Sequence, residues 1–155
     1  MSADVSGSPS TERLMTFEVS GALFALPIAG ILEVLEQKGM SCVPTLPREK
    51  GGVINWHGEA LPVVAPHLLL GGAPMAIRGP DEVSQFLVVT DRPDAPAMLG
   101  LPIDGVTGLI DGSPGRVRGD EVVVERRPLE DRVVSVINPQ RLVAQAALII
   151  QSAVA

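Results

Sequence analysis

The residues whose types and spacing could support chemistry are His57, Glu59 and His67. Imidazole and carboxylate groups are usual zinc ligands, so these three residues suggest a metal site. Their spacing fits neither the helical His-Glu-x-x-His pattern nor the zinc deaminase pattern, because the sequence has no Cys-x-x-Cys pair. We therefore interpret His57 as a surface residue at a hairpin tip and His67 as a strand-end residue. We expect no metal and no other cofactor.

The other reactive residue types lack the companions that catalysis needs. Cys42 has no recognisable base, and the chain contains no Gly-x-Ser-x-Gly nucleophile elbow. The pairs Gly51-Gly52 and Gly71-Gly72 lack the Gly-Lys-Ser/Thr ending of a phosphate-binding loop. Asp104 and Asp111 are more typical of solvated turn carboxylates than of an acid–base couple. These observations favour a non-enzymatic binding module.

The composition limits the partners that such a module can have. The chain of 155 residues suits one domain, and its 14 prolines and 16 glycines favour short strands over long helices. A formal net charge of -6 argues against nucleic acid and anionic membranes as partners. A single cysteine cannot form an internal disulfide, so nothing suggests an oxidising compartment. Residues 1–13 have no apolar run and no basic start, so we expect a disordered tail before a single domain at residues 14–155.

Residues 51–66 are the stretch around which the rest of the chain is organised. Apolar and β-branched residues on both sides of His57-Gly58 predict a strand, a tight turn and a second strand. Pro62 and Pro66 remove backbone donors, which would confine the second strand to a sheet edge or to its own ends. Such an edge would be open to a partner.

Similar patterns predict the elements before this hairpin. Alternation over residues 15–19 and a turn at Ser20-Gly21 indicate a first hairpin. After Pro27 the apolar residues shift to helical spacing, which predicts a short helix that ends at Gly39. The apolar positions in question are Ile28, Ile31, Leu32 and Leu35.

The elements after the hairpin are predicted in the same way. Residues 68–70 would continue the second strand or close it with a turn, and residues 71–85 would contain a crossover loop. Turn-forming residues at 91–96 separate two apolar strands, and short strands are expected at 122–124 and 133–137. Asn138-Pro139 then predicts the start of a C-terminal helix whose apolar stripe packs on the body.

The central stretch resembles the CheW-like adaptor domain of bacterial chemosensory systems. That family has Gly-Val-Ile-Asn-Leu-Arg-Gly, a variable pair, a hydrophobic residue, proline, two hydrophobic residues, Asp-Leu and, after a short basic stretch, Leu-Gly. The residues that match in type and order are Gly52, Val53, Ile54, Asn55, Gly58, Leu61, Pro62, Val63, Val64, Leu70 and Gly71. The chain departs from the family where Trp56 replaces leucine, His57 arginine, Ala65 aspartate and Pro66 leucine.

Two further segments extend the resemblance from about residue 15 to residue 143. Glu33-Val34 lies where the family has a glutamate–valine pair. Residues 100–106 are similar to the family's Gly-Leu-hydrophobic-Val-Asp-x-Val strand, with departures at Pro102 and Ile103. Asn138 stands where an aspartate is usual.

The resemblance implies a mainly β fold of two small five-stranded Src-homology-3-like β-barrels, packed on each other along a hydrophobic seam. A short helix would follow the first hairpin, a helix would end the chain, and the crossover would lie near residues 71–85. The implied function is that of a cytoplasmic, non-enzymatic adaptor between chemoreceptors and a CheA-like histidine kinase. Its partners would be the kinase regulatory domain and the receptor's cytoplasmic tip, without nucleic acid or membrane insertion. Alternatives are a diverged adaptor of another output, such as pilus-driven motility, and a small ligand-binding or enzymatic β-barrel.

The resemblance also implies two contact surfaces. One would be the edge of the central hairpin with the nearby Glu33-Val34 pair, and the other would be the strand at residues 101–106, which would line the seam. The implied partner-binding residues are Glu33, Val34, Asn55, Trp56, His57, Gly58, Pro62, Leu101 and Val106. The same residues could instead only build the turn and fill the core.

Overall fold

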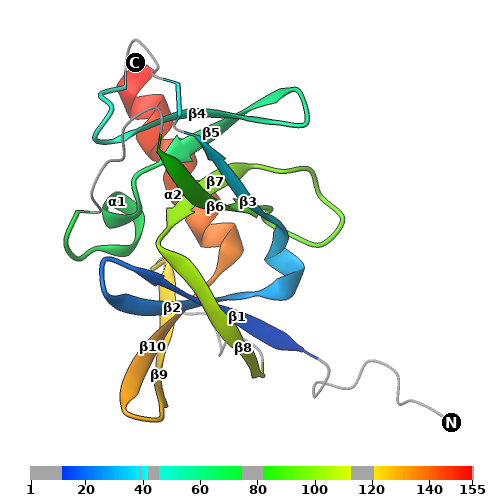
Figure 1. Cartoon of the computed structure of the whole chain (residues 1–155), viewed down its shortest axis with the longest axis vertical. Coiled ribbons are helices and arrows are strands. Elements are labelled where there is room, and N and C mark those ends of the chain that lie inside the picture. The colour runs from blue at the N-terminus through cyan, green and yellow to red at the C-terminus, as the bar shows by residue number, and fades with distance from the viewer. Residues whose placement is uncertain (1–11, 39, 42–45, 75–81, 113–120, 155) are drawn as a thin grey trace, which may run out of the picture.

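The computed structural model describes residues 12–38, 40–41, 46–74, 82–112 and 121–154 (Figure 1). Within these residues, ten strands form two five-stranded sheets, which confirms the expected mainly β fold. The predicted disordered tail falls almost wholly outside the described residues, as does Cys42, while Arg13 already belongs to the first strand.

One sheet combines strands from both ends of the chain, and we call it the terminal sheet. From one edge to the other it contains β8 (Gly105–Asp111), β1 (Arg13–Val19), β2 (Ala22–Pro27), β10 (Arg132–Ile137) and β9 (Val123–Leu129). Its neighbouring strands are antiparallel except β2 and β10, which run parallel. The predicted first hairpin is confirmed, because Ser20 and Gly21 turn the chain at positive φ between β1 and β2.

The other sheet is built from the middle of the chain, and we call it the central sheet. Its order is β3 (Ile31–Lys38), β6 (Val83–Val89), β7 (Leu99–Ile103), β5 (Glu59–Val64) and β4 (Gly51–Trp56). The antiparallel pairs are β3 with β6, β6 with β7 and β4 with β5. Strands β5 and β7 run parallel and pair at Val63 and Gly100.

The chain changes sheets at two places. It enters the central sheet through the 3-10 turn η2 (Ile28–Gly30) and returns to the terminal sheet at Asp104. The return is fixed to the first hairpin, because the Asp104 amide donates to the Glu18 carbonyl at 2.8 Å and the Ser20 amide donates to the Asp104 carboxylate at 2.6 Å. Strands β5 and β6, which flank the crossover predicted near residues 71–85, lie in the same sheet, so the chain does not change sheets there.

The short helix predicted after Pro27 is wrong beyond the three residues of η2. The residues that follow form β3, along which half-buried and exposed side chains alternate from Ile31 to Lys38. The apolar positions fit a helical period as well as a strand. Pairing with β6 decides for the strand, because it gives the backbone groups hydrogen-bonding partners across seven residue pairs.

Two details of the central hairpin also differ from the prediction. The residues after β5 form the helix α1 (Pro66–Leu70), which Pro66 begins with its fixed φ. The edge strand is β4 rather than β5, since β5 lies between β4 and β7. Pro62 is tolerated inside the sheet because β5 pairs with β7 only at Val63.

Three clusters of buried apolar side chains hold the sheets together. The terminal sheet encloses Leu14, Leu23, Ala25, Val134 and Val136. The central sheet encloses Ile54, Leu61, Val63, Phe86 and Val88. A larger shared cluster draws on both sheets and both helices; it contains Phe17, Val19, Phe24, Leu26, Val64, Leu69, Leu87, Val89, Leu99, Leu101, Ile103, Val122, Ile137, Leu142, Val143 and Ala146. The expected pair of small β units with a hydrophobic seam is therefore confirmed.

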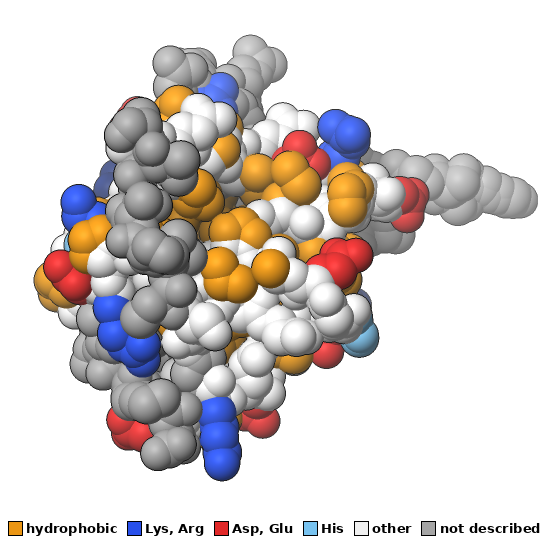
Figure 2. All heavy atoms as spheres, turned by 90° about the horizontal axis from the view of Figure 1, so that it is seen from above, with side chains coloured by type: hydrophobic (Ala, Val, Ile, Leu, Met, Phe, Trp, Pro, Cys, Tyr) orange, Lys and Arg blue, Asp and Glu red, His pale blue; other side chains and the backbone are white. Residues whose placement is uncertain are grey.

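The helix α2 (Pro139–Val154) runs behind the central sheet in the view of Figure 1, and its Leu142, Val143 and Ala146 belong to the shared cluster. Asn138 caps it as predicted, because its side-chain oxygen accepts a hydrogen bond from the Arg141 amide at 3.0 Å. Neither α2 nor the other helical segments of the described chain are long and apolar enough to span a bilayer. Seen from above, apolar side chains gather in the middle of one face and charged side chains lie mainly around its margin (Figure 2).

Candidate protein-binding surface

The tip of the central hairpin is a two-residue turn that projects from the body (Figure 1). His57 and Gly58 occupy the turn at φ 52° and 83°, and Trp56 pairs with Glu59 across it. Consecutive positive φ values match the twist of paired strands, and they favour glycine at the second position. The Asn55 side-chain oxygen accepts a hydrogen bond from the Gly58 amide at 3.1 Å, which holds the turn closed. The predicted hairpin is thus confirmed.

The two outer strands of the central sheet approach each other, so this sheet curls. Beyond the end of β3, Ser41 exchanges backbone hydrogen bonds of 2.8 and 2.9 Å with Val53 of β4. Nearer the tip, the Gln37 side chain donates to the Asn55 carbonyl at 2.9 Å. These contacts bring the Glu33-Val34 part of β3 toward the hairpin.

The carboxylate of Glu33 on β3 contacts the rings of Trp56 and His57 at the hairpin tip, and we call these three residues the Glu33 cluster. The Glu33 atom Oε1 accepts a hydrogen bond from the Trp56 indole at 2.9 Å and lies 3.3 Å from His57 Nε2. The two rings meet edge to face with centroids 4.6 Å apart. The His57 side chain is 69% exposed and that of Glu33 is 39% exposed, so the cluster lies at the surface.

The cluster keeps Glu33 in its charged form. The hydrogen bond from Trp56 is the main cause that lowers the Glu33 pKa below its ordinary value of 4.5, and the hydrogen bond to His57 lowers it further. Partial desolvation of the carboxylate opposes both effects. Glu33 is therefore an anion at neutral pH, available to position the two rings.

The structure brings together most, but not all, of the residues expected to bind partners. Val34 is exposed on β3 beside the Glu33 cluster, Asn55 and Gly58 are exposed on the hairpin, and Pro62 is half-buried further along β5. Leu101 is fully buried in the shared cluster, where it holds the two sheets together and cannot reach a partner.

The stretch at residues 101–106 is not one strand, because the chain changes sheets at Asp104. Val106 therefore lies on β8 of the terminal sheet, and it is 41% exposed. It pairs with Phe17, and Leu109 pairs with Met15. Directly paired residues of antiparallel strands point to the same face. Val106 and Leu109 therefore lie on the face of the terminal sheet that packs against the central sheet, which we call the seam face, but they are exposed to solvent.

Val34 is an exposed side chain on the seam face of the central sheet, because it pairs with Leu87 of the shared cluster. We call Val34, Val106 and Leu109 the seam margin. Leu109 was missed at the sequence level, because an irregularity in the β1–β8 pairing next to Thr16 interrupts the simple alternation along β8. The joining of Glu33 to Trp56 and His57 was missed as well, since no local pattern links residues so far apart.

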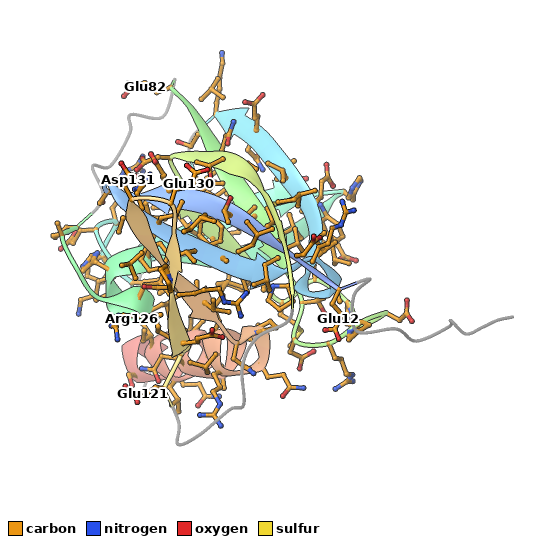
Figure 3. All side chains as sticks on the ribbon, turned by 90° about the horizontal axis from the view of Figure 1, so that it is seen from below. Glu12, Glu82, Glu121, Arg126, Glu130 and Asp131 are labelled. Atoms are coloured by element: carbon orange, nitrogen blue, oxygen red, sulfur yellow. The ribbon has the colours of Figure 1, made fainter. Side chains whose placement is uncertain are left out.

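His57 lies at the turn of the central hairpin and Glu59 begins β5, whereas His67 lies in α1 and not at a strand end as predicted. No three His, Cys, Asp or Glu side chains within the described ranges are close enough to hold a metal ion. Gly51 and Gly52 serve close packing: a Cβ on Gly51 would collide with the Val63 carbonyl, and one on Gly52 with the Ser41 carbonyl. Figure 3 shows acidic side chains spread over different ends of the molecule; those labelled are Glu12, Glu82, Glu121, Glu130 and Asp131.

Two packed, curled five-stranded sheets with an exposed hairpin tip and an apolar seam margin define a β-rich interaction domain. The model of the CheW-like domain matches residues 13–147, and the chain belongs to this family.

One solved structure that resembles the chain is the crystal structure of the scaffolding protein TtCheW from Thermoanaerobacter tengcongensis. The two share 21% sequence identity with a TM-score of 0.61, over 84% of this chain and 91% of that one. At this identity the likeness supports the fold alone. A comparison with curated proteins found no match.

Proposed function

We propose that this protein is a cytoplasmic, non-enzymatic adaptor that couples chemoreceptors to a CheA-like histidine kinase. The observation that carries the proposal is the family match at residues 13–147, which includes every strand of both sheets. An adaptor of two partners needs two surfaces in a fixed relation. The close packing of the shared cluster fixes the two sheets, and the surface that each one carries, relative to each other.

The hairpin tip is the surface that we assign to the kinase regulatory domain. It combines a half-buried tryptophan with exposed hydrogen-bonding groups, and tryptophan is among the residue types most often found at binding hot spots. Its contact residues are Glu33, Asn55, Trp56, His57 and Gly58.

The seam margin is the surface that we assign to the receptor's cytoplasmic tip. Exposed valine and leucine side chains that continue a buried cluster offer apolar area that a partner can cover. Val106 and Leu109 contribute from β8, and Val34 contributes from β3.

The experiment compares variants of the two surfaces in one reconstituted system. Trp56→Ala is expected to weaken binding of the kinase regulatory domain and leave receptor binding unchanged. Val106→Ser with Leu109→Ser is expected to do the opposite. Lys38→Ala, an exposed change on β3 outside both surfaces, serves as the control. If the folded parent protein binds neither partner, the proposed function is wrong.

One observation favours a diverged adaptor of another chemosensory output, such as pilus-driven motility. His57 stands where the family usually has arginine, and its Nε2 already lies 3.3 Å from Glu33 Oε1. A kinase that recognises an arginine at this position would lose a bidentate contact. Binding measured against kinases from different chemosensory systems separates the two cases. A ligand-binding barrel has less support, since apolar side chains fill the interiors of both sheets.

A further inference from the structure

We infer that Glu33 is the positioning residue of the hairpin tip, and that protonation of His57 tightens its hold on the two rings presented there. This inference rests on the proposed function, since it concerns the regulation of that same surface. It assigns to Glu33 a role beyond a direct contact with a partner.

Among the described residues, three polar contacts attach β4 to the β3 side of the central sheet, from the base of the hairpin to its tip. The first is the backbone pairing of Ser41 with Val53, and the second is the bond from Gln37 to the Asn55 carbonyl. The third is the Glu33 contact with both tip rings. Only the third involves a charged group, so it is the attachment that pH can change.

The geometry makes the two tip rings depend on one atom. Oε1 of Glu33 accepts from the Trp56 indole at 2.9 Å and lies 3.3 Å from His57 Nε2. The rings also contact each other edge to face, with centroids 4.6 Å apart. Glu33 lies 23 and 24 positions before them in the chain, and thus holds the tip from a different strand.

The protonation state of the imidazole decides how strongly it is held. A neutral imidazole donates from only one nitrogen, whereas the imidazolium ion donates from both and adds a charge-assisted hydrogen bond to a carboxylate. The charged group in contact with His57 is Glu33 of β3. Glu59 begins β5 opposite Trp56, Glu36 is bonded to Gln85 of β6, and Lys38 ends β3.

The direction of the pH effect follows from this environment. Histidine is the side chain whose charge changes between about pH 5 and pH 8, so we expect the hold to be stronger at about pH 5.5 than at about pH 7.5. Because the pair is exposed, we expect a change of about two- to fivefold in partner affinity between these pH values. A tip fixed in its binding geometry has less conformational freedom to lose on binding, so affinity is higher at the lower pH.

The test uses Trp56 as its reporter, because it is the only tryptophan among the 155 residues. In ¹H–¹⁵N spectra of the full-length protein, its indole N–H resonance is expected to shift between about pH 7.5 and pH 5.5, the range in which histidine gains its charge. His57→Ala should retain the hydrogen-bonded indole but abolish the shift. Glu33→Gln, which keeps an acceptor oxygen without the charge, should greatly reduce the shift.

Glu36→Gln is the matched control. It removes another carboxylate from the same strand, one that accepts a hydrogen bond from Gln85 rather than from the tip. The titration of the indole resonance should be unchanged in this variant. If the parent resonance does not titrate, or titrates equally in Glu33→Gln, the inference is overturned.

A second readout connects the positioning to binding. Titration calorimetry with the regulatory domain of the CheA-like kinase should give the two- to fivefold pH dependence for the parent and for Glu36→Gln. The affinity of His57→Ala for the kinase domain should be the same at both pH values, and so should the affinity of Glu33→Gln. A parent that binds no kinase at either pH would refute the proposed function, while the indole titration would still decide the role of Glu33.

Discussion

Replacing Trp56 by alanine should weaken binding to the kinase regulatory domain more than replacing His57 does, without unfolding the protein. Trp56 is half-buried, and its ring packs against the cluster that the central sheet encloses. Truncating a fully buried aromatic residue costs about 3–5 kcal/mol of unfolding free energy, so a half-buried ring should cost about 2 kcal/mol. A domain of ordinary stability, about 5–15 kcal/mol, stays folded after this loss.

The expected effects on binding differ more than the effects on folding. Truncating a tryptophan hot spot costs about 2 kcal/mol or more, which is about a thirtyfold increase in Kd. His57 is mostly exposed and its contact with Glu33 is screened by water, so His57→Ala should change Kd by about fivefold or less. The indole is also the main donor to Glu33, so Trp56→Ala loosens the attachment of the hairpin to β3.

The assay is titration calorimetry of both variants at about pH 5.5 and pH 7.5, one unit either side of the ordinary histidine pKa. Urea unfolding of each variant separates a lost contact from a lost fold. Equal affinities of Trp56→Ala and the parent would refute the reasoning. A tryptophan fluorescence maximum typical of a fully buried ring would refute it too, because the side chain would then belong to the core.

Four further outcomes are expected. Leu101→Ala should lower the free energy of unfolding by about 2–5 kcal/mol in chemical denaturation, while Val106→Ala, at an exposed position, should change it by about 0.5 kcal/mol or less. Because the Glu33 pKa is lowered on folding, its charged form stabilises the protein above the ordinary pKa of 4.5, and this contribution is lost as pH falls through the folded-state pKa. The melting temperatures of the parent and Glu33→Gln should therefore converge below pH 4.5. A difference that stays constant with pH would contradict a lowered pKa of Glu33. Asn138→Ala should destabilise the protein by about 1 kcal/mol, measured by thermal unfolding, because α2 loses its cap. Elemental analysis should find no stoichiometric metal, and one zinc per chain would disprove this expectation.

The sequence predicts local elements where the pattern and the turn residues agree. The central hairpin has both signals, and so has the Asn138 cap of α2. The segment after Pro27 has only apolar spacing, which fits two periods, and the pairing of β3 with β6 decides between them. The prediction of a strand or turn at residues 68–70 is wrong, because the apolar run hides the helix start that Pro66 provides.

Features that depend on distant parts of the chain were beyond sequence patterns. The order of strands in the terminal sheet joins β2 to β10, and no local signal marks that pairing. The same limit applies to the site. The resemblance places Glu33 near the hairpin, but the bond from its carboxylate to the indole of Trp56 requires the curl of the whole central sheet.

The arrangement of the terminal sheet has a consequence for how the protein is made. The central sheet uses one continuous part of the chain, from β3 to β7, so it has all its strands before the last third has been synthesised. The terminal sheet must wait, because β2 pairs with a strand about 110 residues later, and closing so long a loop is slow. Until β10 emerges from the ribosome, β2 has an open edge and Phe24 and Leu26 lack part of their final packing. The newly made chain is therefore most prone to misassociation in the interval between folding of its middle and arrival of its C-terminal strands.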